Sequence, residues 1–333
     1  MDPLTQGALG ASLPQALSSK KTLWLIGLLG FLSGMAPDLD VFVRSEKDPL
    51  LFLEYHRQFT HSLIFIPFGG LFCATIFYWL IGKKNQLTFK ETWIYCTLGY
   101  ATHGLLDTCT SYGTLLFWPF SNERVAWNNI SIIDPLFTIP ILGLIVAAAK
   151  TSKRKYSAIA VIWAISYLSL GIYLNSTVEK IGKKIAKDRG HKIVRISTKP
   201  SFGNLILWKI IYETNDKFYI DAVRLGFQQK IFPGENINKI NLNKSFPWLK
   251  ENSQQAKDVK RFKWFSNNYI AINPFNKNQI IDIRYSQFPN EIGGLWGIEL
   301  SKEKSESDHI KWYSTAPNPT YTWNIMKSMI FED

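Results

Sequence analysis

The first half of the chain alternates long apolar runs with short polar stretches. Ser62–Gly82 is an uncharged run of 21 residues, and Tyr156–Leu174 is another of 19. A helix needs roughly 20 residues to cross about 30 Å of hydrocarbon. The shorter runs are each compatible with core helices of a water-soluble protein, but their succession favours a polytopic membrane domain. The five predicted spans are Thr22–Pro37, Ser62–Gly82, Thr92–Leu106, Ile132–Ala149 and Tyr156–Leu174.

A sixth segment, Leu4–Leu17, is rich in small residues and only weakly apolar. One interpretation is a short helix packed closely into the bundle, because small side chains let membrane helices approach each other. An N-terminus lying at the membrane interface is the other. The predicted bundle therefore has five or six helices within residues 1–175.

The pattern changes at Asn175. Residues 176–190 predict an amphipathic helix or linker that ends at Gly190. Residues 191–333 carry short runs of strand character, separated by Asn, Asp, Gly and Pro. The expected fold is a predominantly α polytopic membrane bundle followed by a soluble, β-rich (α+β) C-terminal domain. The predicted strands lie in His191–Thr198, Leu205–Glu213, Phe218–Leu225, Tyr269–Phe275, Ile280–Ser286, Trp296–Leu300 and Ile310–Thr315.

The distribution of charged residues predicts how the bundle is oriented in the membrane. The net charge of +12 and the mean hydropathy of −0.04 average over two unlike halves. Lysine and arginine gather around residues 20–21, 83–90 and 150–155, whereas the loops 38–61 and 107–131 hold few. The positive-inside rule places the first set in the cytoplasm, and hence the C-terminal domain on the outer side of the membrane. Because topology explains the basic excess, we expect the lipid bilayer as a partner and no direct nucleic-acid binding. No protein partner is indicated.

The ionisable residues of the membrane half gather on that outer side. The heptad HRQFTHS, residues 56–62, holds two of the five histidines and directly precedes a predicted span. Following the chain back and forth places it with two other motifs, PDLD (37–40) and HGLLD (103–107). Charged groups near the bilayer are costly unless they have partners or water. The candidate ligands for a metal ion are Asp38, Asp40, His56, His61, His103 and Asp107.

These residue types predict a metal site. His103 and Asp107 are four residues apart and share one face of a helix. Imidazole and carboxylate without thiolate suit a divalent metal, with Zn²⁺ preferred and Mn²⁺ or Fe²⁺ as alternatives. Six ligands exceed the three that a catalytic zinc needs, so one or two ions are expected. Taken singly, each motif also fits a purely structural role, as a helix-bonding histidine, a loop turn or an interfacial polar belt.

Arg57 is the candidate catalytic residue beside this site, because its guanidinium suits bidentate contact with a phosphoryl or acyl oxygen. Anchoring at the membrane interface is the alternative. Thr60, Ser62 and Thr110 are candidates for hydrogen bonds that support the ligands. Asp134 either orients a ligand histidine or caps its helix.

The motifs MDPLTQGALG, PDLD, HRQFTHS, HGLLD, TSYGTLLFWPFS and IIDPLF together resemble the membrane-bound metal-dependent hydrolase family, also described as LexA-binding, inner-membrane-associated hydrolases. The resemblance covers roughly residues 1–150, and PSFGNLILWKIIYE resembles the C-terminal region of bacterial members. It implies a bacterial inner-membrane protein with a metal-dependent hydrolase site. Many members carry a histidine where this chain has Gln6, which is a poorer metal ligand.

The expected function is therefore metal-dependent hydrolysis, in which metal-activated water attacks a phosphoester or ester of a lipid-like substrate at the outer face. A non-catalytic membrane scaffold with a structural metal is the alternative. A transporter with a proton or metal relay is less favoured, because FCATIFYWL and LGLIVAAA stay apolar up to the basic loops.

Overall fold

The computed structural model describes residues 1–226, 228–316 and 318–332, which divide into two compact units. The first unit comprises Met1–Val43, Tyr55–Leu174 and the short stretch Phe202–Asn204. The second comprises the remaining residues, including the segment Arg44–Glu54. The chain therefore enters the second unit once before it completes the first.

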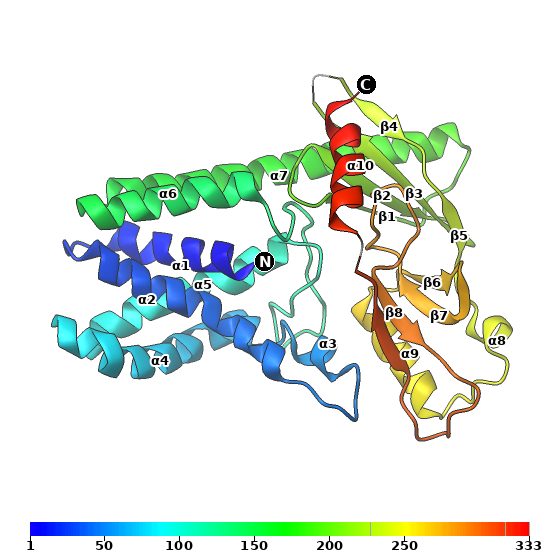
Figure 1. Ribbon diagram of the computed structural model, residues 1–333, viewed down its shortest axis with the longest axis horizontal. Coiled ribbons are helices and arrows are strands. Elements are labelled where there is room, and N and C mark those ends of the chain that lie inside the picture. The colour runs from blue at the N-terminus through cyan, green and yellow to red at the C-terminus, as the bar shows by residue number, and fades with distance from the viewer. Residues whose placement is uncertain (227, 317, 333) are drawn as a thin grey trace. The chain divides into compact units, whose positions relative to one another are not determined.

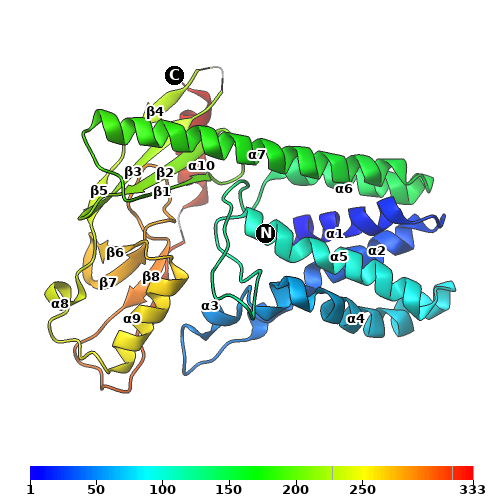
Figure 2. The same ribbon diagram turned by 180° about the vertical axis from the view of Figure 1, so that it is seen from behind.

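The first unit is a bundle of helices that lie alongside one another (Figures 1 and 2). The long helix α7 begins in this bundle and continues into residues of the second unit. The elements of the first unit are α1 (Pro3–Leu17), α2 (Leu23–Met35), η1 (Ala36–Phe42), η2 (Phe59–His61), η3 (Leu63–Phe65), α4 (Ile66–Phe77), η4 (Tyr78–Gly82), η5 (Lys83–Asn85), α5 (Phe89–Cys109), α6 (Pro135–Thr151) and the first part of α7 (Lys155–Asp188). The short helix α3 (Leu51–Tyr55) belongs to the second unit except for its last residue.

Three helical stretches of the described residues are long and apolar enough to cross a membrane: Leu23–Phe42, Leu63–Asn85 and Lys155–Asp188. The helix α6 is apolar but shorter. The structure thus supports a membrane bundle with three candidate spans, a coarser result than the five or six helices expected. Helix α1 packs against α2, and most of its residues are buried, many of them small.

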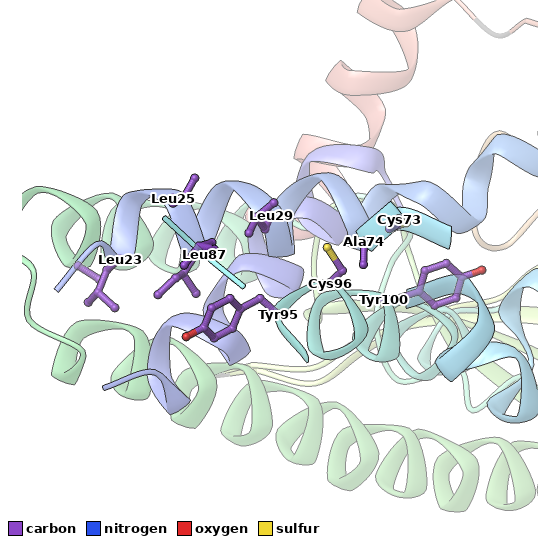
Figure 3. Close-up of a cluster of buried hydrophobic side chains, with 11 residues drawn as sticks. Leu23, Leu25, Leu29, Cys73, Ala74, Leu87, Tyr95, Cys96 and Tyr100 are labelled. Carbon is purple, nitrogen blue, oxygen red and sulfur yellow. The ribbon is translucent and has the colours of Figure 1, made fainter. Parts of the chain in front are cut away.

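Close approach between helices depends on glycine. A Cβ atom at Gly99 of α5 would lie 2.4 Å from the carbonyl oxygen of Gly30 on α2, and one at Gly30 would lie 2.4 Å from the carbonyl oxygen of Gly10 on α1. Only glycine permits these separations, and small residues are a common device of helix packing in membranes. A core of buried apolar side chains from α2, α4 and α5 adjoins this contact, as the labelled side chains of Figure 3 show.

Helix ends in the bundle follow local chemistry. Asp2 caps α1 by accepting from the backbone N–H of Thr5, and Thr88 with Glu91 forms a capping box at the start of α5. The predicted break after Leu174 is absent, and α7 runs on to Asp188. The polar residues that follow Leu174 include no proline, and the helix ends only near Gly190, whose φ is +72°.

The second unit contains two antiparallel sheets, as the strand-like runs predicted. In the first sheet the order is β1-β2-β3-β4, with β5 also pairing with β3; the second has the order β6-β7-β8-β9. A turn joins the antiparallel strands β2 and β3, while β4, β5 and three helices were not predicted. The elements are β1 (Arg195–Pro200), β2 (Leu207–Glu213), β3 (Lys217–Arg224), β4 (Lys230–Phe232), β5 (Asn236–Asn238), α8 (Leu242–Ser245), α9 (Gln254–Phe265), β6 (Ile270–Asn273), β7 (Asn276–Asp282), β8 (Trp296–Glu299), β9 (Lys311–Ser314) and α10 (Pro319–Phe331).

The segment Arg44–Glu54 is held in the second unit by Arg261 of α9. The guanidinium of Arg261 contacts both carboxylate oxygens of Asp48, at 2.9 and 2.8 Å, and a carboxylate oxygen of Glu54 at 2.5 Å. It also donates to Asp258 over 3.0 Å. Phe52 adds an edge-on ring contact with Trp312 of β9. A single arginine thus tethers a segment that lies more than 200 residues earlier in the chain.

Candidate metal centre

The structure brings all six predicted ligands to one end of the bundle. Asp38 and Asp40 lie on η1, directly after α2, and His103 and Asp107 lie in the last turns of α5. His56 and His61 come from the irregular segment between α3 and α4. The residues form two groups whose ligand atoms lie within 4.8 Å of one another: Asp38, His61, His103 and Asp107, and Asp38, Asp40 and His56.

The first group has the dimensions of a tetrahedral metal site. Nε2 of His61 lies 3.4 Å from Asp38 Oδ1 and 3.3 Å from Asp107 Oδ2. Nε2 of His103 lies 3.3 and 3.7 Å from the same two oxygens, and 2.9 Å from Nε2 of His61. Zinc–ligand bonds of about 2.1 Å in a tetrahedron place the ligand atoms about 3.4 Å apart. These four side chains therefore fit one zinc-sized ion.

Both histidines present Nε2 to the centre because their Nδ1 atoms are occupied elsewhere. His103 Nδ1 donates to the carbonyl oxygen of Gly34 over 2.6 Å, which leaves a lone pair on Nε2. His61 Nδ1 lies 3.2 Å from Oδ2 of Asp40 and 3.0 Å from Oγ1 of Thr60. Histidine ligands of metals are oriented in this way, by an acceptor on the other ring nitrogen. Two facing Nε2 atoms need a cation between them, which can be a metal ion or a proton.

The pKa of His61 shows that a proton can occupy this position in place of a metal ion. Burial lowers the pKa of His61, but its hydrogen bonds with Asp107, Asp38 and Asp40 outweigh burial and raise the pKa to about 10. A metal ion binding here would therefore displace a proton, as is general for histidine ligands.

Asp107 is completely buried, and its two oxygens have different surroundings. Oδ1 accepts from the amide Nε2 of Gln6 at 2.9 Å and also contacts the amino group of Met1. Oδ2, which faces the histidines, lies 3.0 Å from Nε of Arg57 and 3.3 Å from Nε2 of His61, but it accepts no well-aligned hydrogen bond from any residue that the structure describes. A buried carboxylate oxygen without such a bond is costly, and coordination to an ion would satisfy it. Gln6 thus helps to hold Asp107 in place.

The carboxylate of Asp40 makes polar contacts with four other residues. Its Oδ1 contacts Nδ1 of His56 at 2.7 Å, and its Oδ2 accepts from the backbone N–H of Arg57 at 3.0 Å and from Oγ1 of Thr60 at 2.9 Å. Together with the contact to His61, these bonds occupy both carboxylate oxygens. The geometry favours a supporting role for Asp40, which was predicted as a ligand. A second ion between Asp38, Asp40 and His56 would have to displace these contacts.

Arg57 is buried, with 4% of its surface exposed. Its Nε lies 3.0 Å from Oδ2 of Asp107, its Nη1 donates to Oγ1 of Thr110 over 2.9 Å, and its guanidinium lies over the ring of Tyr112 at 4.8 Å. The backbone φ of Arg57 is +65°, a conformation that L residues rarely adopt and that clusters at functional sites. Contact of Arg57 with a substrate oxygen stays a prediction, since its charge is directed at Asp107.

The loop after α5 supports the heptad and contains residues that the sequence did not indicate. Leu115 donates its N–H to the carbonyl oxygen of Arg57, and Leu63 donates to that of Leu116. Tyr112 was missed, although the aromatic ring contacts both Arg57 and His56. Gly104 was missed as well: a Cβ there would lie 2.1 Å from the carbonyl oxygen of His61. Glycine next to His103 was the available signal for that close approach.

Asp134 lies apart from these groups. Its Oδ1 accepts from the backbone N–H of Phe137, which caps α6, and its Oδ2 accepts from the hydroxyl of Tyr167 at 2.9 Å. Of the two roles predicted for Asp134, capping the helix is the one that these contacts support.

Comparisons with known proteins place this centre in a membrane family. The family described as YdjM inner membrane protein matches residues 1–178. The Bacillus subtilis protein YfhP is 27% identical over 223 residues, which cover 63% of this chain and 62% of YfhP. The Escherichia coli inner membrane protein YbcI is 29% identical over 136 residues, which cover 39% of this chain and 75% of YbcI. The chain thus spans less than two thirds of YfhP. No solved structure matches the chain.

Proposed function

Because the chain belongs to the YdjM inner membrane protein family, we propose that its membrane unit holds a divalent metal ion and hydrolyses a phosphoester or ester of a lipid-like substrate. One observation carries the metal: the Nε2 atoms of His61 and His103 face each other at 2.9 Å, beside Oδ2 of buried Asp107, which accepts no well-aligned hydrogen bond among the described residues. Zinc suits this set best, since the four ligand atoms are spaced as in a tetrahedron, and Mn²⁺ or Fe²⁺ are alternatives.

Hydrolysis is supported by the pair formed by His56 and Asp40. A divalent ion at the centre supplies Lewis acidity and lowers the pKa of a bound water towards about 7. His56 lies beside the centre, is held by Asp40 at 2.7 Å and has a side chain that is 19% exposed. Burial lowers the pKa of His56 below its ordinary value, so that its ring is neutral at pH 7. We assign His56 the role of general base, which takes the proton of the attacking water and returns it to the leaving alcohol. The sequence had suggested His56 as a metal ligand instead.

The surroundings of the centre favour a lipid-like substrate. Leu39 lies between the two aspartates of η1 and Phe42 follows them, and these side chains are 57% and 80% exposed. Phe120, in the loop after α5, is 84% exposed. Large exposed apolar side chains beside a polar centre suit the interface of a membrane, where an ester group meets hydrocarbon.

A membrane scaffold with a structural metal is the second candidate, and one observation favours it. Structural zinc sites have four protein ligands, whereas catalytic sites have three and an open position. The first group offers four. Asp38 is the ligand whose side chain is partly exposed, at 19%, and it would have to yield its place to water in the enzyme.

Metal analysis and lipid hydrolysis of the purified full-length protein test the proposal. We expect about one equivalent of zinc in the wild type and in His56→Gln, and its loss in His103→Gln. Release of an alcohol or phosphate from phospholipids should fall about 10²- to 10⁴-fold in His56→Gln. His191→Gln, in the second unit, is the matched control. Protein that takes up no divalent metal would overturn the site. Metal binding without hydrolysis of any phospholipid or ester would favour the second candidate, a membrane scaffold with a structural metal.

A further inference from the structure

A second polar site lies at the other end of the bundle. It is a cavity of about 300 Å³ formed where α1 and α6 end and where α2 and α7 begin. Its walls include Ser19, Lys20, Lys21, Ser152 and Arg154. Along α5 the neighbouring Glu91 is 16 residues from Asp107, which corresponds to about 24 Å. The cavity is therefore separate from the metal centre.

The polar lining of this cavity consists of cations and hydroxyl groups. Lys20 is paired with Glu91 at 2.7 Å. Lys21 and Arg154, in contrast, have no carboxylate within salt-bridge distance among the described residues. Both are exposed, and Ser19 and Ser152 can donate hydrogen bonds beside them. Such a lining has the charge and the donors that a phosphate group requires.

A partly apolar groove continues from the cavity. This groove of about 210 Å³ shares Ser18 and Ser19 with the cavity and then extends over Leu17, Ile94 and Leu98; Tyr95 and Glu91, whose carboxylate is paired with Lys20, complete its lining. Leu17 is 63% exposed and Ile94 is 44% exposed. A cationic recess that opens onto an exposed apolar groove has the two-part chemistry of a phospholipid, with a charged headgroup and an acyl chain.

We propose that this cavity and groove bind an anionic phospholipid of the leaflet at the basic end of the bundle. Its phosphate lies between Lys21 and Arg154, and an acyl chain follows Leu17, Ile94 and Leu98. Charge complementarity selects an anionic lipid over a zwitterionic one, and basic pockets between membrane helices are known to favour such headgroups. The continuity of the groove with the cavity distinguishes a lipid from free phosphate. The inference does not depend on the hydrolase activity.

Native mass spectrometry of the full-length protein in detergent tests this site, with phosphatidylglycerol and phosphatidylcholine as probes. We expect the wild type to retain phosphatidylglycerol in preference to phosphatidylcholine, and Lys21→Gln/Arg154→Gln to bind it about tenfold more weakly or worse. The control Lys84→Gln/Lys90→Gln removes the same charge from another basic loop and should bind like the wild type. All four side chains are exposed, so folding should be unaffected; the midpoint of thermal unfolding in detergent serves as the check.

Two further measurements separate a lipid from other anions. Ile94→Ser should weaken phosphatidylglycerol binding, and inorganic phosphate at millimolar concentration should not displace the lipid from the wild type. Equal binding of both lipids, or equal losses in the two double variants, would overturn the site. Displacement by inorganic phosphate together with normal binding by Ile94→Ser would show an anion site that takes only the headgroup, and would overturn the lipid assignment.

Discussion

His103 donates from Nδ1 to the carbonyl oxygen of Gly34 over 2.6 Å, so the contact of α5 with α2 fixes the direction of a candidate metal ligand. The same two helices meet one turn earlier, where Gly99 touches the backbone of Gly30. The packing of α5 against α2 therefore also sets the orientation of the His103 ring.

Gly99→Ala should loosen the bundle and the metal centre together. Its Cβ would lie 2.4 Å from the carbonyl oxygen of Gly30, so α5 must shift, at a cost of about 1–3 kcal/mol. We expect a lower midpoint of thermal unfolding in detergent and a weaker affinity for zinc. Gly143→Ala on α6, where a Cβ would have nothing within 4 Å, is the control and should match or slightly exceed the wild type. Unchanged zinc affinity in a destabilised Gly99→Ala would show that packing and ligand direction are independent.

Asp40→Asn should weaken metal binding without abolishing it. The carboxylate of Asp40 accepts from Thr60 and Arg57 and contacts both His56 and His61, but its oxygens are not free for the ion. Loss of such support typically lowers metal affinity 10- to 100-fold. Competition with a chelator of known affinity measures this value. In the same assay, Asp107→Asn should lower the metal affinity more than Asp40→Asn does. The reverse order would make Asp40 a ligand.

Arg261→Met should free the segment Arg44–Glu54 without unfolding the second unit. Arg261 binds Asp48, Glu54 and Asp258, of which Asp258 is completely buried. Loss of these contacts costs about 2 kcal/mol, which corresponds to about a thirtyfold larger open population. Trypsin should therefore cleave at Lys47 about thirty times faster. Lys257→Met, an exposed position on the same helix, should digest like the wild type.

Lys209 should make the stability of the second unit depend on pH. Its Nζ is buried and donates to Ser286 Oγ at 2.6 Å and to the carbonyl oxygen of Glu291 at 3.0 Å. Burial lowers the pKa of Lys209 to about 7, whereas the unfolded chain titrates near 10.4. Between these values the unfolded state binds more protons, so stability rises with pH, by up to about 1.4 kcal/mol per unit.

Urea unfolding of the full chain at pH 7, 8 and 9 measures this dependence. Lys209→Met has no proton to exchange, and its stability relative to the wild type should fall as the pH rises from 7 to 9. A constant difference between the two proteins would mean that Lys209 stays charged in the folded state.

The sequence predicted the location of the centre better than its internal order. Helix parity and the four-residue spacing of His103 and Asp107 sufficed to bring six residues to one end of the bundle, because helices fix which ends meet. Which of Asp38 and Asp40 faces the Nε2 atoms of His61 and His103 depends on the path of η1, which the sequence does not specify. Apolar runs likewise indicated a membrane domain. Five or six helices were expected, whereas three stretches of the described residues meet the length and composition of a span.

Other features depended on distant residues. Arg57 was expected to face a substrate, and its burial beside Asp107 follows from a left-handed backbone conformation that the sequence does not signal. Arg261 and Asp48 pair across more than 200 residues, and no local pattern links them. The amide of Gln6 bonds to Asp107 across 101 positions of the chain, and no local pattern links these two residues either.

The excursion of residues 44–54 into the second unit has a consequence for the architecture of the protein. Asp40 and His56, which touch each other, are joined by a stretch of chain that is ordered by contacts with the other unit. Along the chain, the residues of the two units therefore alternate and do not form two consecutive segments. Cutting the chain after α7 would remove Arg261 and leave the link between Asp40 and His56 without the side chain that holds it, so an isolated bundle is not equivalent to the bundle within the whole protein.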